Sequence, residues 1–182
     1  MNTALLLIDI QNDYFPNGKF ELHEPIQAAS NAKEILERFR EINAEIIHIQ
    51  HIAKKADATF FIADTEGVSI HPLVSPLERE LIITKSTPNS FNDTDLHNVL
   101  QTKKVNHLVI CGMMTHMCID ATVRAAKDLG YTITLIEDAC ATRDLDFNNK
   151  AVQSSHVQTA FVSALNGTYA DIKNKENYLA ER

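Results

Sequence analysis

The stretch Val109–Tyr131, VICGMMTHMCIDATVRAAKDLGY, begins with an apolar run, continues through a short turn that contains a glycine, and ends as an amphipathic helical pattern. A buried strand followed by a helix is the repeating unit of α/β proteins. Cys118 lies in this turn, where the predicted strand ends and the predicted helix begins. A free cysteine in that position is either a small packing residue or a nucleophile.

The rest of the chain repeats this alternation of strand and helix. Continuous apolar runs predict strands buried on both faces of a sheet, and they cover Ala4–Ile10, Glu45–Gln50, Leu81–Thr84, His107–Cys111 and Thr132–Ile136. Helical periods predict helices over Ile26–Asn43, Thr94–Lys104, Ile119–Leu129 and Asn148–Leu165. We therefore expect a three-layer α-β-α sandwich around a mostly parallel sheet of about six strands. The segment Ile52–Arg79 interrupts the pattern, and we expect a loop or lid there.

The composition limits the class of protein. With 182 residues, 45% of them hydrophobic and 23% charged, the chain fits a single domain over residues 1–182. Its net charge of −7 disfavours nucleic acid and anionic membranes as partners, because both attract basic surfaces. No apolar run approaches the roughly 20 residues of a membrane helix, and MNTALLLIDIQNDY lacks the basic leader of a signal peptide.

The three cysteines have no metal-type spacing and are odd in number. This is typical of free thiols in a reducing compartment, so we expect a cytoplasmic protein. Cys111 lies inside an apolar run, and Cys140 has no cationic neighbour in sequence, so both are predicted to be structural.

Three reactive side chains follow three of the predicted strands. Asp9 comes at the end of the first run, Lys85 after the third, and Cys118 after the fourth. Ligands of parallel sheets bind beyond the carboxyl ends of the strands, so we expect the three side chains to meet at one edge. A nucleophile, a proton acceptor and a cation together meet the requirements of acyl transfer by a cysteine.

Each of these residues also has a structural interpretation. Cys118 packs as a small hydrophobe in one interpretation; in the other, a helix N-terminus lowers the pKa of its thiol and offers backbone N–H groups to an oxyanion. Asp9 caps a turn by binding its own backbone, although Asp13 is better placed for that. Lys85 extends its ammonium to water.

The spacing of the histidines does not favour a metal site. His48 and His51 are three residues apart on or just after a strand, which places them on opposite faces. His71 and His97 have no partner at ligand spacing. His116 precedes the thiol by two residues, a spacing at which helical side chains do not face each other. We therefore expect His116 at the mouth of a pocket or in solvent.

Taken together, these motifs resemble those of the isochorismatase-like cysteine hydrolases, which include nicotinamidases, N-carbamoylsarcosine amidases and isochorismatases. The resemblance runs from ALLLIDIQNDYF through ITKSTPNSF and VICGMMTHMCIDATVRAAKDLGY to IEDACAT and ALNGTYADI. It implies a triad of Asp9, Lys85 and Cys118, in which the cysteine attacks a carbonyl or imidate carbon and the aspartate moves the proton. The lysine would hold the aspartate and lower the pKa of the thiol. It also implies a cis peptide bond between Met113 and Met114, and an oxyanion hole formed by the backbone N–H groups of Met114 and Cys118. A dimeric or tetrameric assembly is implied as well.

The chain departs from the nicotinamidase pattern at the metal site. Nicotinamidases hold a metal with an aspartate and a histidine two residues apart, and the matching positions in IQHIAKK are His51 and Ala53. The resemblance therefore implies a site without metal or other cofactor. The cysteine favours amide chemistry over the vinyl-ether hydrolysis of isochorismatase itself.

The leading hypothesis is a metal-independent cysteine hydrolase of a small amide, carbamoyl or related C–N substrate. The second is a metal-assisted nicotinamidase that uses His48, His51 or His71. The third is a catalytically idle protein that binds a small ligand, and the intact triad counts against it. The candidates for the pocket wall are Tyr14, Phe15, Phe60, Phe61, Phe91 and His116.

Overall fold

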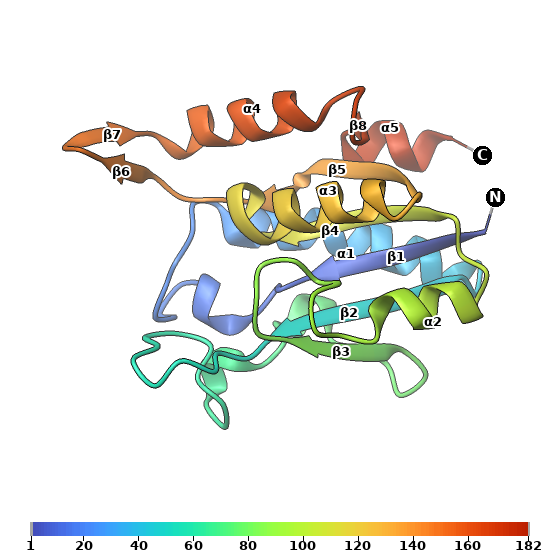
Figure 1. Cartoon of the computed structure of the whole chain (residues 1–182), viewed down its shortest axis with the longest axis horizontal. Coiled ribbons are helices and arrows are strands. Elements are labelled where there is room, and N and C mark those ends of the chain that lie inside the picture. Colours follow the sequence, from blue (N-terminus) through green and yellow to red (C-terminus); the bar gives the residue numbers. More distant parts are fainter. Residues whose placement is uncertain (1, 182) are drawn as a thin grey trace.

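The central sheet has six strands, and each neighbouring pair in it runs parallel (Figure 1). The strand order is β3-β2-β1-β4-β5-β8. The strands are β1 (Thr3–Ile8), β2 (Glu45–His51), β3 (Leu81–Lys85), β4 (His107–Met113), β5 (Thr132–Ala141) and β8 (Asp171–Lys173). The structure is a computed structural model that describes residues 2–181.

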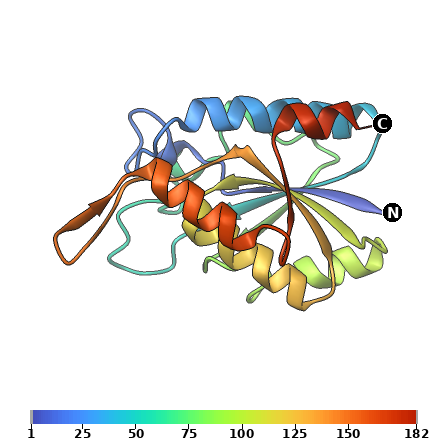
Figure 2. The same cartoon turned by 90° about the horizontal axis from the view of Figure 1, so that it is seen from above.

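Helices cover both faces of the sheet, which confirms the predicted three-layer sandwich (Figure 2). α1 and α5 lie on one face, and α2, α3 and α4 lie on the other. The helices are α1 (Pro25–Glu41), α2 (Leu96–Thr102), α3 (Asp120–Asp128), α4 (Ser154–Leu165) and α5 (Lys175–Ala180). Among residues 2–181, no helix is both long and apolar enough to cross a membrane.

β1 shows why the central strands are apolar on both sides. Leu5 and Leu7 belong to the core cluster that includes the buried face of α1, whereas Leu6 and Ile8 belong to the cluster that includes Val123 of α3. These four β1 side chains are at most 2% exposed. Burial of each such side chain contributes about 1.5–3 kcal/mol. A strand of alternating polar and apolar residues would lose that contribution on one face, so the run in the sequence is continuous.

The C-terminal third differs from the sequence prediction. The helix predicted from Asn148 begins at Ser154, because the residues before it form a hairpin of β6 (Leu145–Phe147) and β7 (Lys150–Val152). Asn148 and Asn149 turn this hairpin with φ of 52° and 59°, the left-handed conformations that a type I′ turn requires. No range was predicted for β8 or α5, which are too short to show a clear period.

The predicted loop Ile52–Arg79, all of it within the described residues, has no strand or α-helix. Two single-turn 3-10 helices interrupt it, Glu66–Val68 and Pro72–Val74. An antiparallel bridge between Ile70 and Gln11 fixes the loop beside the segment that follows β1. The loop therefore lies at the carboxyl edge of the sheet.

The sheet changes direction between β1 and β4. From β1 the chain continues to β2 and β3 on one side, and from β4 it continues to β5 and β8 on the other. Ligands of open α/β sheets bind beyond the carboxyl ends of the strands at such a switch point. Gly112 of β4 lets the two strands approach closely there: its φ is +137°, and a Cβ atom would overlap the carbonyl oxygen of Ile8.

Candidate active site

Asp9, Lys85 and Cys118 meet at this switch point. Nζ of Lys85 lies 2.6 Å from Oδ2 of Asp9 and 3.3 Å from Sγ of Cys118. All three residues are almost entirely buried, with exposed fractions of 0% for Asp9 and 4% for each of the other two. The structure thus brings together the three residues that the sequence places after three different strands.

The backbone turns the Asp9 carboxylate away from the line of β1. Asp9 has a φ of 52°, in the left-handed region that aspartate tolerates better than most residues. Neither carboxylate oxygen accepts an aligned hydrogen bond within residues 2–181, so the contact with Lys85 is ionic in character. Burial raises the pKa of Asp9 above its ordinary value, and the Lys85 charge opposes that rise. A carboxylate that binds a proton more tightly than usual is a stronger general base.

The ammonium of Lys85 is surrounded by acceptors. Besides Asp9 and Cys118, it contacts Nδ1 of His51 at 3.1 Å and donates to the carbonyl oxygen of Thr87 at 3.0 Å. Burial on its own lowers the pKa of Lys85, but the charges of Asp9 and Cys118 outweigh burial and raise that pKa. Lys85 therefore stays a cation at the centre of the cluster.

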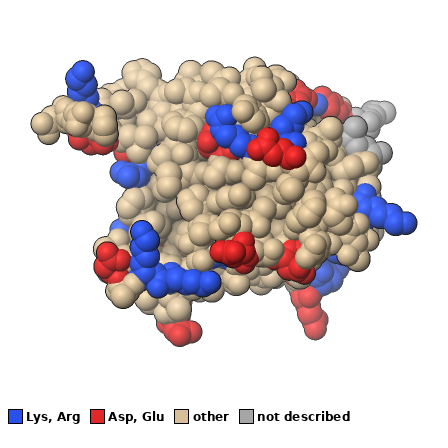
Figure 3. All heavy atoms as spheres, in the orientation of Figure 1, with Lys and Arg blue, Asp and Glu red and all other residues tan. Residues whose placement is uncertain are grey.

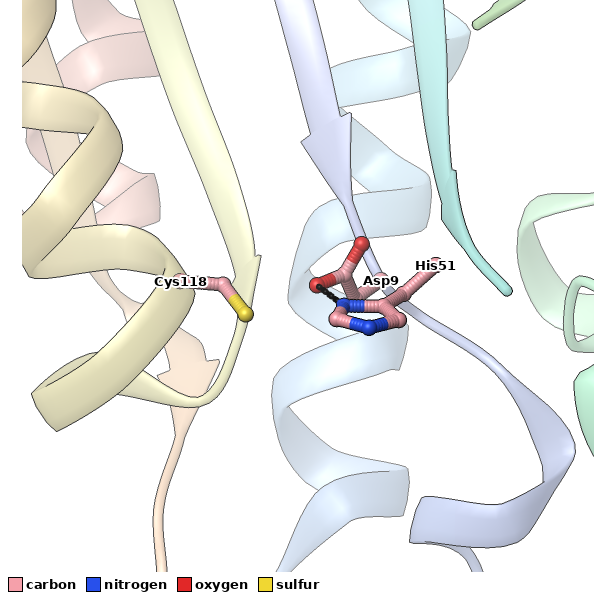
Figure 4. Close-up of side chains that lie close together, drawn as sticks. All are labelled: Asp9, His51 and Cys118. Carbon is pink, nitrogen blue, oxygen red and sulfur yellow. Dashed lines mark ion pairs between the residues drawn. The ribbon is translucent and has the colours of Figure 1, made fainter. Parts of the chain in front are cut away.

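Asp9, His51 and Cys118 also form a donor set of the kind that binds a metal (Figure 4). One ligand atom of each lies within 4.8 Å of the other two. Carboxylate, imidazole and thiolate are ordinary zinc ligands. The Lys85 ammonium, however, contacts all three of these side chains and so takes the place that a metal cation would need. The donor set fits the lysine and does not fit an additional metal.

Cys118 lies in a π-helical turn, η4 (Thr115–Ile119), that leads directly into α3. Burial raises the pKa of its thiol, the Asp9 carboxylate raises it further, and the Lys85 ammonium opposes both. The sequence predicted the reverse, a thiol pKa lowered by a helix N-terminus. That prediction was wrong because burial outweighs the helix end. A thiol with a raised pKa is neutral at neutral pH and needs a base beside it to react as a nucleophile.

The turn before the thiol has the expected backbone. The peptide bond between Met113 and Met114 is cis. The Met114 carbonyl oxygen accepts hydrogen bonds from the N–H groups of Met117 and Ile119, at 3.0 and 3.2 Å. The Met114 N–H donates to no acceptor within residues 2–181. That N–H is therefore available for the predicted role in an oxyanion hole.

Tyr14 and Phe61, two of the predicted wall residues, lie beside the triad. Their ring centroids are 4.6 Å apart, and the Phe61 ring lies 5.6 Å from that of His51. Burial raises the pKa of Tyr14, and the charges of Cys118 and Asp9 raise it further. These aromatic rings pack beside His51, and their role as a pocket wall stays a prediction.

The other four wall candidates are Phe15, Phe60, Phe91 and His116. Phe60 packs against Phe20 with ring centroids 4.5 Å apart. Phe15 stacks on His71 with centroids 3.6 Å apart, and both line a neighbouring hollow of about 500 Å³. Phe91 packs against the core cluster that includes Cys118 and residues of α2 and α3, and its ring centroid lies 6.0 Å from that of Tyr131. His116 points to the end of β5, with Nδ1 2.6 Å from Oγ1 of Thr142.

Gln11 shapes the site and was not a candidate from the sequence. Its side chain is buried, and its amide brackets the backbone of His51: Nε2 donates to the His51 carbonyl oxygen at 2.9 Å, and Oε1 accepts from the His51 N–H at 2.7 Å. Nε2 also donates to the carbonyl oxygen of Val68 at 2.7 Å. The only sequence signal was a polar residue directly after an apolar strand, which is equally typical of a turn.

Asp13 holds two loops together at the entrance. Its Oδ1 accepts from the N–H of Lys19 at 3.1 Å, and its Oδ2 accepts from the N–H of Phe61 at 2.6 Å. Asp13 is therefore the carboxylate that binds backbone, which leaves Asp9 for the triad.

His48 and His51 belong to different environments. Nε2 of His48 lies 3.0 Å from Oε2 of Glu80, and both of those side chains are buried. His51 instead contacts Lys85. The two imidazoles therefore do not form a metal-binding pair.

Comparison with known proteins identifies the family. The family model for the Isochorismatase domain matches residues 3–166. The chain is 54% identical over 179 residues to the isochorismatase family protein YddQ of Bacillus subtilis, covering 98% of this chain and 99% of that one. It is 32% identical over 142 residues to a streptothricin hydrolase of Streptomyces noursei, covering 78% of this chain and 50% of that one. A crystal structure described as an isochorismatase hydrolase from Oleispira antarctica superposes with a TM-score of 0.95 at 43% identity, over 98% of this chain and 96% of that one. The chain therefore belongs to the isochorismatase family and is a hydrolase of that family.

Proposed function

We propose that this hydrolase uses Cys118 as a nucleophile on the carbonyl carbon of a small amide, carbamoyl or related C–N substrate, without a metal. The observation that carries the proposal is the buried contact among Asp9, Lys85 and Cys118. The three side chains supply a proton acceptor, a fixed cation and a nucleophile. The relative named streptothricin hydrolase supports hydrolysis as the reaction class.

In the first half-reaction, the thiol proton moves to the Asp9 carboxylate as Sγ of Cys118 bonds to the carbonyl carbon. Because the thiol pKa is raised, the proton leaves during attack and not beforehand. The carbonyl π electrons move to oxygen, and the backbone N–H groups of Met114 and Cys118 stabilise the resulting oxyanion. Collapse of this intermediate breaks the C–N bond, and the leaving nitrogen takes the proton from Asp9. The acyl group remains on Cys118 as a thioester.

In the second half-reaction, water adds to the thioester carbon and gives a proton to Asp9. Collapse then breaks the C–S bond, returns the proton to sulfur and releases the acid. Lys85 remains a cation throughout and stabilises the carboxylate form of Asp9 each time that the proton leaves it.

The two alternatives fit the site less well. A metal-assisted nicotinamidase would need the donor atoms that Lys85 already contacts. A catalytically idle binding protein would have no use for an ion pair buried this deeply, because such pairs seldom stabilise a fold more than apolar side chains of similar size. A catalytic role therefore explains the buried ion pair of Asp9 and Lys85 better than a structural role does.

The test is ammonia release from a panel of small amides and carbamoyl compounds, nicotinamide included, with and without a chelator. Wild type and Cys118→Ala are compared side by side. We expect release that requires Cys118 and is insensitive to the chelator. Release that the chelator abolishes would favour the metal-assisted alternative, and no release from any compound would contradict an amide substrate.

We further infer that the protein is a cytoplasmic homo-oligomer. Cys111, Cys118 and Cys140 are all free and buried, as suits a reducing compartment. The β6–β7 hairpin projects from the body as an arm (Figures 1 and 2), and Phe147 on it is 77% exposed. Residues 151–170, which include α4, contain no Asp, Glu, Lys or Arg, and the surface over α4 is largely uncharged, whereas the arm carries charged side chains (Figure 3). Such a surface lets two copies of net charge −7 approach without direct repulsion.

A further inference from the structure

His51 is held in position from three sides. Gln11 bonds to its backbone N–H and carbonyl oxygen, at 2.7 and 2.9 Å. The ring of Phe61 lies 5.6 Å from the imidazole ring. Nδ1 of His51 lies 3.1 Å from the ammonium of Lys85. These contacts together fix the position of the imidazole.

These contacts decide which ring nitrogen of His51 carries the proton. The Lys85 ammonium only donates, so Nδ1 is the acceptor and carries no proton. Burial lowers the pKa of His51 to about 4, with the Lys85 charge adding to the effect, so the ring is neutral at neutral pH. A neutral ring with a bare Nδ1 carries its hydrogen on Nε2. The 3.9 Å approach of Nδ1 to Asp9 in Figure 4 is therefore not a salt bridge.

The Nε2–H group of His51 has no hydrogen-bond partner within residues 2–181. In Figure 4, Nε2 is the ring nitrogen without a dashed line, and it lies on the side of the ring away from the Asp9 carboxylate, beyond the ends of the strands. The His51 side chain is 18% exposed, whereas the side chains of Asp9 and Lys85 are at 0%. Among these three side chains, that of His51 is therefore the most accessible to a ligand, and its free polar group is an uncharged N–H donor.

We propose that His51 is a substrate-binding residue whose Nε2–H donates a hydrogen bond to an acceptor atom of the substrate. The proposal rests on the proposed function of Cys118, and it narrows the substrate class. The substrate carries an uncharged oxygen or nitrogen acceptor near the scissile carbonyl group. An ammonium group in that position is excluded, because it would face an N–H donor and the nearby Lys85 cation. Gln11 is the positioning residue that aims the donor.

The tautomer of His51 is tested first, on the wild-type protein and without any substrate. Long-range ¹H–¹⁵N correlation spectra of the imidazole rings distinguish a proton on Nε2 from one on Nδ1. We expect the Nε2–H form from about pH 5.5 to pH 8.5 with no titration of His51 in that range, since its pKa is about 4. The Nδ1–H form, or a titration near the ordinary histidine value, would overturn the proposal.

The binding role is tested by kinetics with the amide that the panel shows to be hydrolysed fastest. His51→Phe keeps an aromatic ring beside Phe61 and removes the donor, and we expect KM to rise about 5- to 100-fold, the effect of losing one hydrogen bond in a buried site. His51→Gln restores a side-chain N–H and should recover most of that loss. His97→Phe is the matched control, because His97 lies on α2 and contacts Tyr131 at 3.0 Å.

Three outcomes of these kinetics are distinguishable. An unchanged KM in His51→Phe overturns the binding role. Hydrolysis that survives in Cys118→Ala overturns the proposed function instead. A fall in kcat with an unchanged KM shows that His51 acts only through Lys85, which also contradicts substrate binding.

Discussion

The ammonium of Lys85 lies 2.6 Å from a carboxylate oxygen of Asp9, and both side chains are completely excluded from solvent. A buried ion pair adds little net stability, since desolvation offsets most of the attraction between its charges. Losing one partner is a different matter, because it leaves a buried charge without compensation. Asp9 and Lys85 therefore each need the other to remain charged. The pKa of the Cys118 thiol depends on both charges.

Lys85→Met should destabilise the protein by about 3–5 kcal/mol at pH 8, as expected when one partner of a buried pair is removed. The loss of unfolding free energy should be smaller at pH 4 than at pH 8. Because the pKa of Asp9 is raised in the folded state, its contribution to stability is largest below its ordinary pKa and declines as pH rises. The Lys85 charge lowers the pKa of Asp9, so without Lys85 this pKa rises further and stability falls more steeply as pH rises. Urea unfolding at the two pH values measures it.

The control for this experiment is Lys33→Met, since Lys33 forms a surface pair with Glu37 and both side chains are about half exposed. That change should cost less than about 1 kcal/mol at either pH. An equal loss for Lys85→Met at pH 4 and pH 8 would show that Asp9 is not the group left unpaired.

Asp9→Asn should separate ionisation of the thiol from catalysis. Loss of the carboxylate charge removes one cause of the raised pKa of Cys118, while Lys85 remains to favour the thiolate. We expect Cys118 to react faster with iodoacetamide than in wild type at pH 8. Amide hydrolysis should fall about 10²- to 10⁴-fold, because the general base is gone.

Peptide mass spectrometry after timed alkylation resolves Cys118 from Cys111 and Cys140, whose thiol pKa values are also raised by burial. These two cysteines serve as internal controls in each sample. Slower alkylation of Cys118 in Asp9→Asn would mean that Asp9 already holds the thiol proton in the resting protein, contrary to the mechanism proposed above.

Glu80→Gln should reduce the loss of unfolding free energy that the protein shows as the pH falls below the ordinary glutamate pKa. Burial alone would raise the pKa of Glu80, but hydrogen bonds from Arg40, the Leu77 N–H and His48 lower it to about 2. The folded state therefore gains stability above the ordinary glutamate pKa, and this gain is lost between about pH 4.5 and pH 2. It amounts to up to about 3 kcal/mol.

Urea unfolding between pH 7 and pH 2 measures this slope. Glu34→Gln is the control, because Glu34 pairs with Lys175 at the surface and its side chain is 50% exposed. It should leave the slope unchanged. If Glu80→Gln and wild type lose stability in parallel over this range, Glu80 is not the group that titrates.

Much of the fold followed from residues whose environment is local in sequence. β1 and β4 are buried on both faces, so their continuous apolar runs predict strands. The reactive residues come at the ends of strands or soon after them, so their meeting at one edge of the sheet could also be predicted. The hairpin at Asn148 and Asn149 was misread as helix because three-residue strands show no period. The pKa of Cys118 was predicted in the wrong direction for another reason: its burial depends on groups far away in the chain.

His51 shows the same limit. Its orientation depends on Gln11, 40 positions away, and on Lys85, 34 positions away. In the sequence His51 is only a polar residue at the end of a strand, and metal binding was the sole role that its spacing suggested. The contact with Lys85 exists only after β2 and β3 have paired in register, with His51 opposite Lys85.

Gly112→Ala should lose far more stability than Gly130→Ala. Both glycines have positive φ, +137° and +91°, so both substitutions place alanine in an unfavourable conformation that costs about 1–2 kcal/mol. At Gly130 no atom lies within 4 Å of the new Cβ, whereas at Gly112 it would overlap the carbonyl of Ile8. We expect Gly112→Ala to lose at least about 3 kcal/mol or to fail to fold. Thermal unfolding measures both, and equal losses would contradict close contact of β1 and β4.

Phe147→Asp should convert the proposed oligomer to a smaller species without affecting the fold. A two-stranded hairpin is marginally stable by itself in water, and Phe147 is exposed on an arm that projects from the body. A second copy that covers this arm would bury the ring, and a buried carboxylate there would oppose association. Light scattering with size-exclusion chromatography measures the mass. The matched control is Ile82→Asp, because Ile82 is also an exposed apolar residue, at 43%, but lies on β3, at the edge of the sheet opposite β8. A wild-type protein that is monomeric at all concentrations, or an oligomer that survives Phe147→Asp unchanged, would rule out association through this arm.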